Sequence, residues 1–317
     1  MDGLFYVAAV IIGLVFGSFF NVCIYRLPRD EDLGARSRCP SCREIIRWYD
    51  NIPIVSFIIL RGGCRHCGSR ISLRYPIVEA GSAALFALVY YWSVNLVPLD
   101  LKISTPKITT PEIFIGLIVV SALIISTGVD LRHGIIPNEV TYTGFALLIP
   151  LTVGLALWRD QPGRILISFA SGIGAGGFLL SAGLIYGALF MKKSAAKGKS
   201  TGAQSEEQDE EQGSKTRSHT DDLDESSTEE LKTGIGMGDV KLMTMTGLAL
   251  GYFHWYLVIL ALFMGYFMGA VVAIALIALK KKSRKDRIPF APYLAIGSFV
   301  SLIWGYKIIE IYLNLLG

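Results

Sequence analysis

Two aspartates have the residue type and the setting that could support catalysis. Asp130 lies in "STGVDLRHGIIPNEVT" and Asp239 in "GIGMGDVKLM", each at the boundary of a long apolar run. An ionisable group at such a place is costly, which makes it a functional candidate. Two facing carboxyls cannot both ionise easily, so one keeps its proton while the other takes a proton from water. The pair as a whole would therefore supply an acid and a base for hydrolysis.

The neighbours of Asp239 fit such a site. Glycines at 234, 236 and 238 would let a substrate backbone approach closely, or would break the helix there. Lys241 could pair with a carboxylate or a phospholipid, and Glu79 is a further intramembrane acid; we expect both, with Gly236 and Gly238, to line the site. The competing interpretation is that each aspartate is an interfacial charge at a helix end, such as an N-cap.

Four cysteines form a second candidate site. They occur as "CPSC" and "CRHC", separated by 21 residues, and this spacing lets four thiolates reach one tetrahedral zinc ion. Because the four thiolates would fill all four positions of the zinc coordination shell, the zinc would be structural. His66 is therefore not expected to bind it. Cys23 is expected to pack within an apolar segment. The predicted ligands are Cys39, Cys42, Cys64 and Cys67.

The elements that position these residues are apolar segments. The 317-residue chain is 52% apolar and only 18% charged. Segments of roughly 20 apolar residues can cross a bilayer, whereas a soluble core shows amphipathic periods. The sequence therefore predicts an all-α polytopic membrane protein with about eight transmembrane helices. They lie near residues 4–25, 76–94, 112–129, 139–158, 164–191, 240–252, 254–279 and 290–316.

Arginine and lysine predict the orientation of these helices. The loop 26–75 holds ten arginines, and "KKKSRKDR" at 280–287 holds six basic residues. Basic residues concentrate in cytoplasmic loops, so we expect the N-terminus outside and the cysteines in the cytoplasm, where reduced thiols persist. Asp130 then ends the third helix and Asp239 begins the sixth, both at the cytoplasmic side.

The chain divides into five expected parts. Residues 1–25 form the first helix, 26–75 the zinc loop, 76–191 the helices two to five with Asp130, and 233–317 the last three helices with Asp239. Residues 192–232 are rich in acidic and small polar residues and nearly free of apolar ones, which predicts a disordered loop. The "GAGG" run at 174–177 predicts close helix packing through small residues.

Several motifs, taken in order, resemble one known family. They are "GSFFNVCIYRLPR", "CPSC", "CRHC", "RYPIVE", "DLRHGIIPN" and "GMGDVKL", and together they are similar to the bacterial type IV prepilin peptidases. The resemblance implies a GxGD-type aspartyl protease of the bacterial inner membrane that cuts the leader from prepilins or pseudopilins at the cytoplasmic face. It also implies methylation of the new N-terminus with S-adenosylmethionine. Asp130 and Asp239 match the family's catalytic pair, and the four cysteines match its zinc ligands.

Two positions depart from the family pattern. Asn138 stands where an acid is common, and Ala291 where glycine is common. No Rossmann-type glycine loop is found, so we expect a methyl-donor site near the cytoplasmic loop, Asn21 and Arg26. The expected partners are prepilins or pseudopilins and the lipid bilayer, with no nucleic acid. The alternatives are an ion-coupled transporter that uses the two aspartates, and a zinc-bearing scaffold for pilus assembly.

Overall fold

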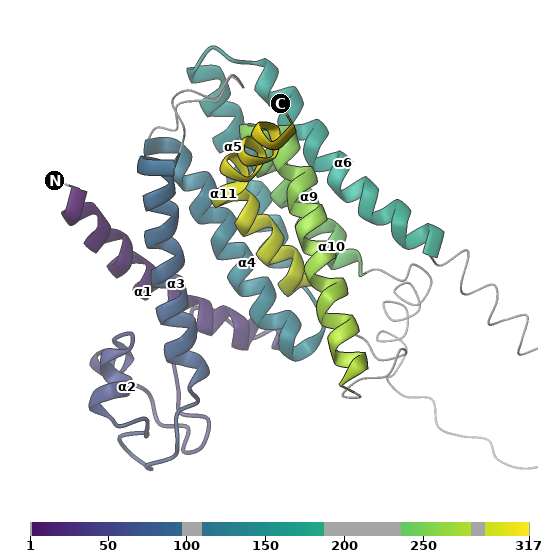
Figure 1. Ribbon diagram of the computed structural model, residues 1–317. Coiled ribbons are helices and arrows are strands. Elements are labelled where there is room, and N and C mark those ends of the chain that lie inside the picture. The colour runs from purple at the N-terminus through teal and green to yellow at the C-terminus, as the bar shows by residue number, and fades with distance from the viewer. Residues whose placement is uncertain (1, 97–109, 187–235, 280–288, 317) are drawn as a thin grey trace, which may run out of the picture.

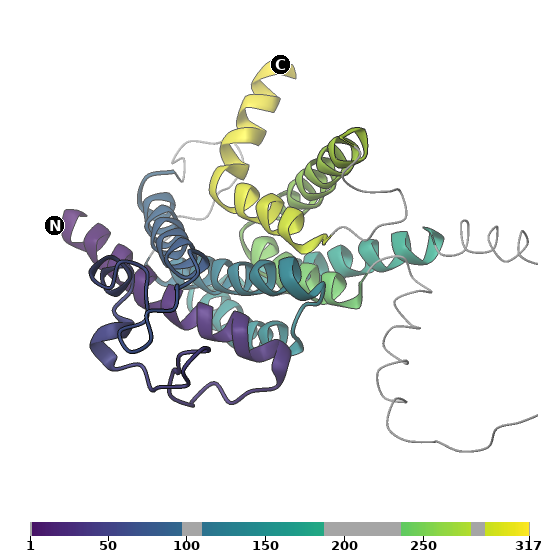
Figure 2. The same ribbon diagram turned by 90° about the horizontal axis from the view of Figure 1, so that it is seen from below.

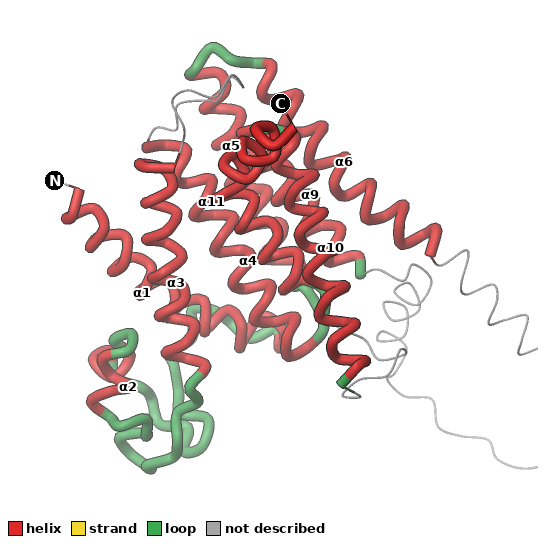
Figure 3. Tube along the Cα trace, in the orientation of Figure 1, coloured by secondary structure: helices red, strands yellow, loops and turns green. Residues whose placement is uncertain are grey.

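The protein is a bundle of long helices with one large loop at one end (Figure 1). The computed structural model describes residues 2–96, 110–186, 236–279 and 289–316. Within these ranges there is no strand, and Figure 3 shows helix and loop alone. The helices are α1 (Asp2–Arg26), α2 (Val55–Ile59), α3 (Arg74–Tyr91), α4 (Ile113–His133), α5 (Asn138–Trp158), α6 (Gly163–Tyr186), α9 (Met237–Phe253), α10 (Trp255–Ala278) and α11 (Ala291–Leu316).

Seven of the described helices are long and apolar enough to cross a membrane. They are α1, α3, α4, α5, α6, α10 and α11, and they confirm the polytopic all-α prediction. The sixth predicted segment forms α9, which has 17 residues, and 11 of these are buried. Because α9 packs against α4, α5, α6, α10 and α11, it lies among protein neighbours rather than lipid. The chain breaks at His254, whose backbone is extended, so α9 and α10 are separate helices.

Small residues bring α6 and α9 into close contact. A Cβ on Gly172 would lie 2.9 Å from the carbonyl oxygen of Thr244, and one on Gly176 would overlap the Thr244 hydroxyl. The Ser168 hydroxyl donates to the carbonyl oxygen of Leu248 at 2.6 Å. Gly176 belongs to the "GAGG" run, so the predicted packing role is confirmed at that position.

One end of the bundle gathers the residues singled out in the sequence. The last turns of α1 and α4 and the first turns of α3, α5, α9 and α11 lie at this end, where the start of α11 packs against Gly265 and Gly269 of α10. We call it the aspartate end. The loop between α1 and α3, residues 27–73, lies beside it and is called the cysteine loop. Seen from below in Figure 2, this loop lies under α1 and α3, to one side of α9, α10 and α11. The acidic segment predicted to be disordered, 192–232, lies outside the described residues, as does Gly234.

Candidate active site at the aspartate end

Asp130 lies buried in the last turn of α4. Its side chain is 7% exposed, and its Oδ2 accepts a hydrogen bond from the backbone N–H of Ala291 at 3.1 Å. Ala291 is the first residue of α11, so the positive end of that helix dipole faces the carboxylate. Gly134 ends α4 in the left-handed conformation (φ 66°) and donates its N–H to the Asp130 carbonyl oxygen. The chain then turns directly into α5.

Asp239 lies in the first turn of α9, beside the connector that follows Asp130. Gly236 precedes the helix with an extended backbone, and the Asp239 N–H donates to its carbonyl oxygen at 3.1 Å. A Cβ on Gly238 would lie 2.8 Å from Cβ of Ile136, which belongs to the α4–α5 connector. Glycine at 238 thus lets the start of α9 approach the end of α4. The first turn of α9, which carries Asp239, therefore lies against the connector that follows the Asp130 turn of α4.

Lys241 continues this contact one turn further along α9. Its Nζ donates to Oδ1 of Asn138 at 2.8 Å and lies 5.4 Å from the centre of the Tyr142 ring. The partner of Lys241 is therefore an amide oxygen and an aromatic face on α5, not a carboxylate. The contact of Lys241 with Asn138 is therefore a hydrogen bond from a cation to a neutral amide oxygen, not an ion pair.

Three other predicted residues lie where α1, α3 and the cysteine loop join; Glu79 and Arg26 bind the loop, and Asn21 ties α1 to α3. The Glu79 side chain, 8% exposed, accepts the N–H of Ile54 at 2.8 Å. Nδ2 of Asn21 donates to the carbonyl oxygen of Tyr75 at 3.0 Å. Arg26 donates to the carbonyl oxygens of Asp32, Leu33, Ala35 and Arg36. All three side chains are thus engaged within the chain, at the junction of α1, α3 and the loop.

The four predicted zinc ligands come together within the cysteine loop. Their sulfur atoms all lie within 4.8 Å of one another, and Sγ of Cys39 lies 3.9 Å from Sγ of Cys67. A tetrahedral site with zinc–sulfur bonds of ~2.3 Å has sulfur–sulfur edges of about 3.8 Å. The arrangement therefore fits a zinc ion. His66 is not among the grouped ligands and Cys23 is buried in α1, as predicted.

The two cysteine pairs have the same local fold. In each pair, the N–H of the first cysteine donates to the carbonyl oxygen of the residue five positions later. Cys39 donates to Glu44, and Cys64 donates to Ser69. The residue after the second cysteine is left-handed in both pairs: Arg43 has φ 59° and Gly68 has φ 68°. Such turns point backbone N–H groups at sulfur. The Cys42 N–H lowers the pKa of the Cys39 thiol to about 6, which favours the thiolate that binds metal.

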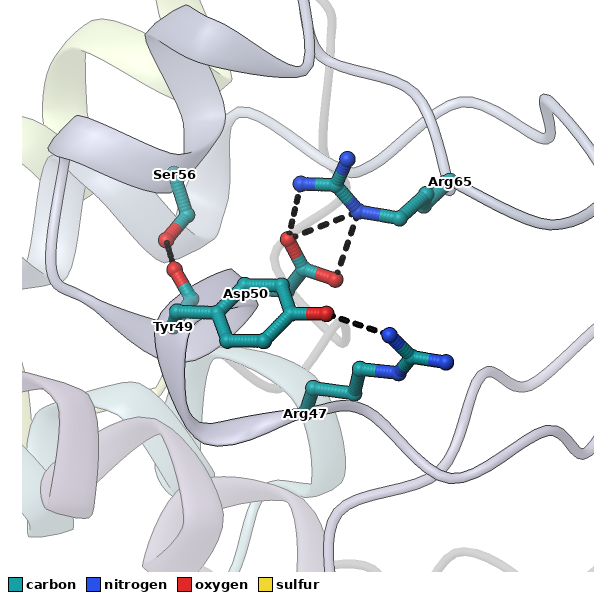
Figure 4. Close-up of polar contacts among 5 residues, drawn as sticks. All are labelled: Arg47, Tyr49, Asp50, Ser56 and Arg65. Carbon is teal, nitrogen blue, oxygen red and sulfur yellow. Dashed lines mark hydrogen bonds and ion pairs between the residues drawn. The ribbon is translucent and has the colours of Figure 1, made fainter.

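An ion pair ties the second cysteine pair to the segment between the two pairs (Figure 4). Nε of Arg65 donates to Oδ2 of Asp50 at 2.9 Å, and this contact lowers the pKa of the Asp50 carboxyl. The Tyr49 hydroxyl accepts from Arg47 at 2.6 Å, and the Ser56 hydroxyl donates to the Tyr49 carbonyl oxygen at 3.0 Å. The segment that leads into α2 is therefore held against the cysteine cluster.

An apolar groove of about 830 Å³ runs between α6 and α10, which diverge from one another in both ribbon views. Its walls carry Ala170, Gly174 and Phe178 on one side and Leu262, Phe263 and Tyr266 on the other. The Tyr266 ring also packs against that of Phe290, the residue before Ala291, with 5.2 Å between the ring centres. The groove therefore leads from the apolar flank of the bundle toward the aspartate end.

Comparisons with known proteins identify the family of this chain. Residues 11–93 match the Bacterial Peptidase A24 N-terminal domain, and residues 117–274 match the Type IV leader peptidase family. The chain is 37% identical to a prepilin leader peptidase/N-methyltransferase of Klebsiella pneumoniae, over 54% of this chain and 80% of that relative. The chain belongs to the type IV leader peptidase family. Prepilin leader peptidase/N-methyltransferases of Pseudomonas putida and Bacillus subtilis are 26% and 27% identical, over 99% and 96% of this chain and 95% and 96% of those relatives. No solved structure matches the chain.

The sequence of this type IV leader peptidase did not predict two contacts that backbone N–H groups make with Asp130 and Glu79. The N–H of Ala291 that holds Asp130 has no side-chain signature, although position 291 already stood out as a departure from glycine. The N–H of Ile54 that binds Glu79 has no side-chain signature in the sequence either. The hydrogen bond between Lys241 and Asn138 was not predicted either, because the two residues are 103 positions apart in the sequence.

Proposed function

We propose that this type IV leader peptidase hydrolyses the leader peptide of prepilins or pseudopilins, with Asp130 and Asp239 as its catalytic pair. The observation that carries the proposal is the close approach of the first turn of α9, which carries Asp239, to the connector that follows the Asp130 turn of α4. One carboxylate takes a proton from water, whose oxygen attacks the scissile carbonyl carbon. The protonated partner gives its proton to the leaving amine as the carbon–nitrogen bond breaks.

The substrate of the proposed reaction has two chemically different parts. A basic leader suits the polar aspartate end, and an apolar segment that follows it suits the groove between α6 and α10. Tyr266 joins the two regions, because it lines the groove and its ring packs against Phe290, next to Ala291. Gly236, which directly precedes α9, and Gly238 and Lys241, which lie in its first two turns, line the path of the scissile bond. Glu79 lines it from the side of α3.

The same proposal includes methylation of the new N-terminus. The free amine attacks the methyl carbon of S-adenosylmethionine, the carbon–sulfur bond breaks, and the amine releases a proton. Asn21 and Arg26 are our candidates for the donor site. Arg26 would act indirectly, because its guanidinium already binds the carbonyl oxygens that shape residues 32–36. A zinc ion bound by the four thiolates would have a structural role, because it would keep the cysteine loop folded beside this site.

The proposed location is the bacterial inner membrane, with the aspartate end in the cytoplasm. The eight arginines of residues 27–73 support this orientation, since basic loops stay on the cytoplasmic side. The aspartates and the cysteine loop then share one side of the membrane with the basic leader of the substrate. Reduced thiols persist in that compartment and bind zinc.

The test is a mass spectrum of a prepilin N-terminus after incubation with membranes that hold this protein, with and without S-adenosylmethionine. We expect loss of the leader in both samples and one added methyl group only with the donor. Asp130→Asn and Asp239→Asn should each leave the substrate uncut. Asp160→Asn is the matched control, because Asp160 lies exposed in the turn between α5 and α6.

Three outcomes separate the alternatives. Cleavage without methylation would keep the peptidase and remove the methyltransferase. Uncut substrate with every variant, together with ion flux that depends on Asp130 and Asp239, would replace the proposal with a transporter. Uncut substrate without flux would leave the zinc-bearing scaffold as the function of the chain.

A further inference from the structure

Residues 48–61 of the cysteine loop, "WYDNIPIVSFIILR", reach back along the membrane helices. The N–H of Ile54 binds Oε2 of Glu79, the sixth residue of α3. With a rise of ~1.5 Å per residue, Glu79 lies about 7.5 Å along the helix from Arg74. Because Arg74 marks the headgroup level, the backbone of Ile54 is held about a turn and a half inside the apolar zone.

A second contact, with α1, places the same segment at the same depth. Asn51 and Pro53 line a cavity of about 270 Å³ together with Ser18, Phe19 and Val22 of α1. Gly17, the residue before Ser18, packs directly on α3, because a Cβ there would lie 2.7 Å from Cα of Glu79. The segment is therefore packed between the side chains of two membrane-spanning helices and does not stand away from them.

The outer face of this segment is apolar and exposed. In the short helix α2, Val55 is 47% exposed, Ile58 is 67% and Ile59 is 69%. Trp48 precedes this helix and is 80% exposed, and Arg61 follows it. An aromatic residue, an apolar turn and an arginine are the composition of an interfacial anchor, in which the apolar face enters the headgroup–acyl boundary by about 5–10 Å.

The backbone at Ile54 shows that the segment is held in place. Ile54 has φ 61° and ψ −46°, close to the rare and strained γ-turn of positive φ, and the N–H of Val55 donates across this turn to the carbonyl oxygen of Pro53 at 2.6 Å. Such a conformation persists when its surroundings determine it, and here the N–H of Ile54 is bound by Glu79. This turn sends the chain from the cavity beside α1 into the exposed helix α2.

We propose that residues 48–61 are a membrane anchor whose partner is the anionic lipid surface of the bilayer that α1 and α3 cross. Val55, Ile58 and Ile59 enter the acyl boundary, and the loop arginines meet lipid phosphates. The charge is complementary, because residues 27–73 hold eight arginines against five acids and no lysine. Glu79 is then a positioning residue that sets the height of the cysteine cluster. This inference does not depend on peptidase activity.

The experiment places a photoreactive benzophenone amino acid at Ile58 of the full, zinc-loaded chain in nanodiscs containing phosphatidylglycerol. After illumination, intact mass spectrometry should show phospholipid adducts. The matched control carries the same amino acid at Glu44, an exposed acidic position of the same loop, and should show none. Equal adduct yields at the two positions, or none at Ile58, would overturn the proposal.

Hydrogen exchange on the unsubstituted chain gives a second measurement if the benzophenone variants fold poorly. Amides of residues 55–60 should exchange more slowly in phosphatidylglycerol nanodiscs than in purely zwitterionic ones. Glu79→Ala should abolish that difference, while Glu79→Gln, which keeps an acceptor for the Ile54 N–H, should preserve it. Identical exchange in both bilayers for the parent chain would remove the anionic lipid as the partner.

Discussion

A single substitution can remove the hydrogen bond that the backbone N–H of Ala291 donates to Asp130. Ala291→Pro deletes the N–H that Oδ2 of Asp130 accepts at 3.1 Å. Proline suits the first position of a helix, which is where Ala291 lies in α11. The new restriction on the preceding residue falls on Phe290, which is outside the helix. The variant therefore removes one donor and leaves the helix start intact.

The size of the effect follows from the charge of the acceptor. A hydrogen bond to a charged group contributes about 1.5–3 kcal/mol. Each 1.36 kcal/mol of transition-state stabilisation is about tenfold in rate. If this bond orients the Asp130 carboxylate during hydrolysis, kcat for prepilin cleavage should fall by about ten- to a hundredfold, with KM little changed.

The assay is the initial rate of leader cleavage by purified protein in detergent, over a range of prepilin concentrations. Ala291→Gly is the matched control, because it keeps the N–H and removes only a buried methyl group. Thermal unfolding of both variants separates a loss of positioning from a loss of structure. If the proline variant is folded and cleaves as fast as the glycine variant, the contact does not position Asp130, and the reasoning is refuted.

Three further predictions concern the cysteine loop and α9. Cys42→Ser should lower bound zinc from about one per chain and open the loop to proteolysis, whereas Cys23→Ser should keep the metal, as measured by elemental analysis. In metal-free protein, Ser69 lowers the pKa of the Cys67 thiol, so its alkylation should persist to lower pH than for an ordinary thiol. Ser69→Ala should shift that midpoint upward, and an unchanged midpoint would contradict this. Gly238→Ala should lower the unfolding temperature, because its Cβ would lie 2.8 Å from the α4–α5 connector; overpacking costs about 1–3 kcal/mol.

Hydrophobic length alone predicted the helices well, because a membrane-spanning segment must be continuous and apolar. The expected segment 139–158 is α5, Asn138–Trp158, and 254–279 is α10, Trp255–Ala278. The start of α9 was placed three residues late, at 240. Its first turn is Met-Gly-Asp, where glycine and a carboxylate weaken the apolar signal although Asp favours a helix N-terminus.

Helix count and arginine distribution predicted Asp130 and Asp239 on one side of the membrane, but they did not predict the contacts around them. The structure places the first turn of α9 against the connector that follows α4. Sequence periodicity carries no information on which N–H meets a carboxylate 161 residues away, as with Ala291 and Asp130. The same holds for Lys241 and Asn138, which are 103 residues apart. The catalytic role of the pair stays a prediction.

The groove between α6 and α10 offers a direct test of how the proposed substrate is held. Gly174 lines it, and a Cβ added there would meet nothing within 4 Å, so Gly174→Leu should fill the groove without disturbing the fold. Gly177, on the same helix, has the same open surroundings but is not part of the groove wall, which makes Gly177→Leu a matched control.

If the apolar segment of a prepilin lies in this groove, Gly174→Leu should raise KM for the full-length substrate and leave kcat nearly unchanged. A short soluble peptide that contains only the leader and the scissile bond should be cleaved equally by both variants, because it never enters the groove. Equal KM values for the two variants on full-length prepilin would place the apolar segment elsewhere on the bundle. A fall in cleavage of both substrates would instead show that position 174 acts on the catalytic end through α9, against which α6 packs.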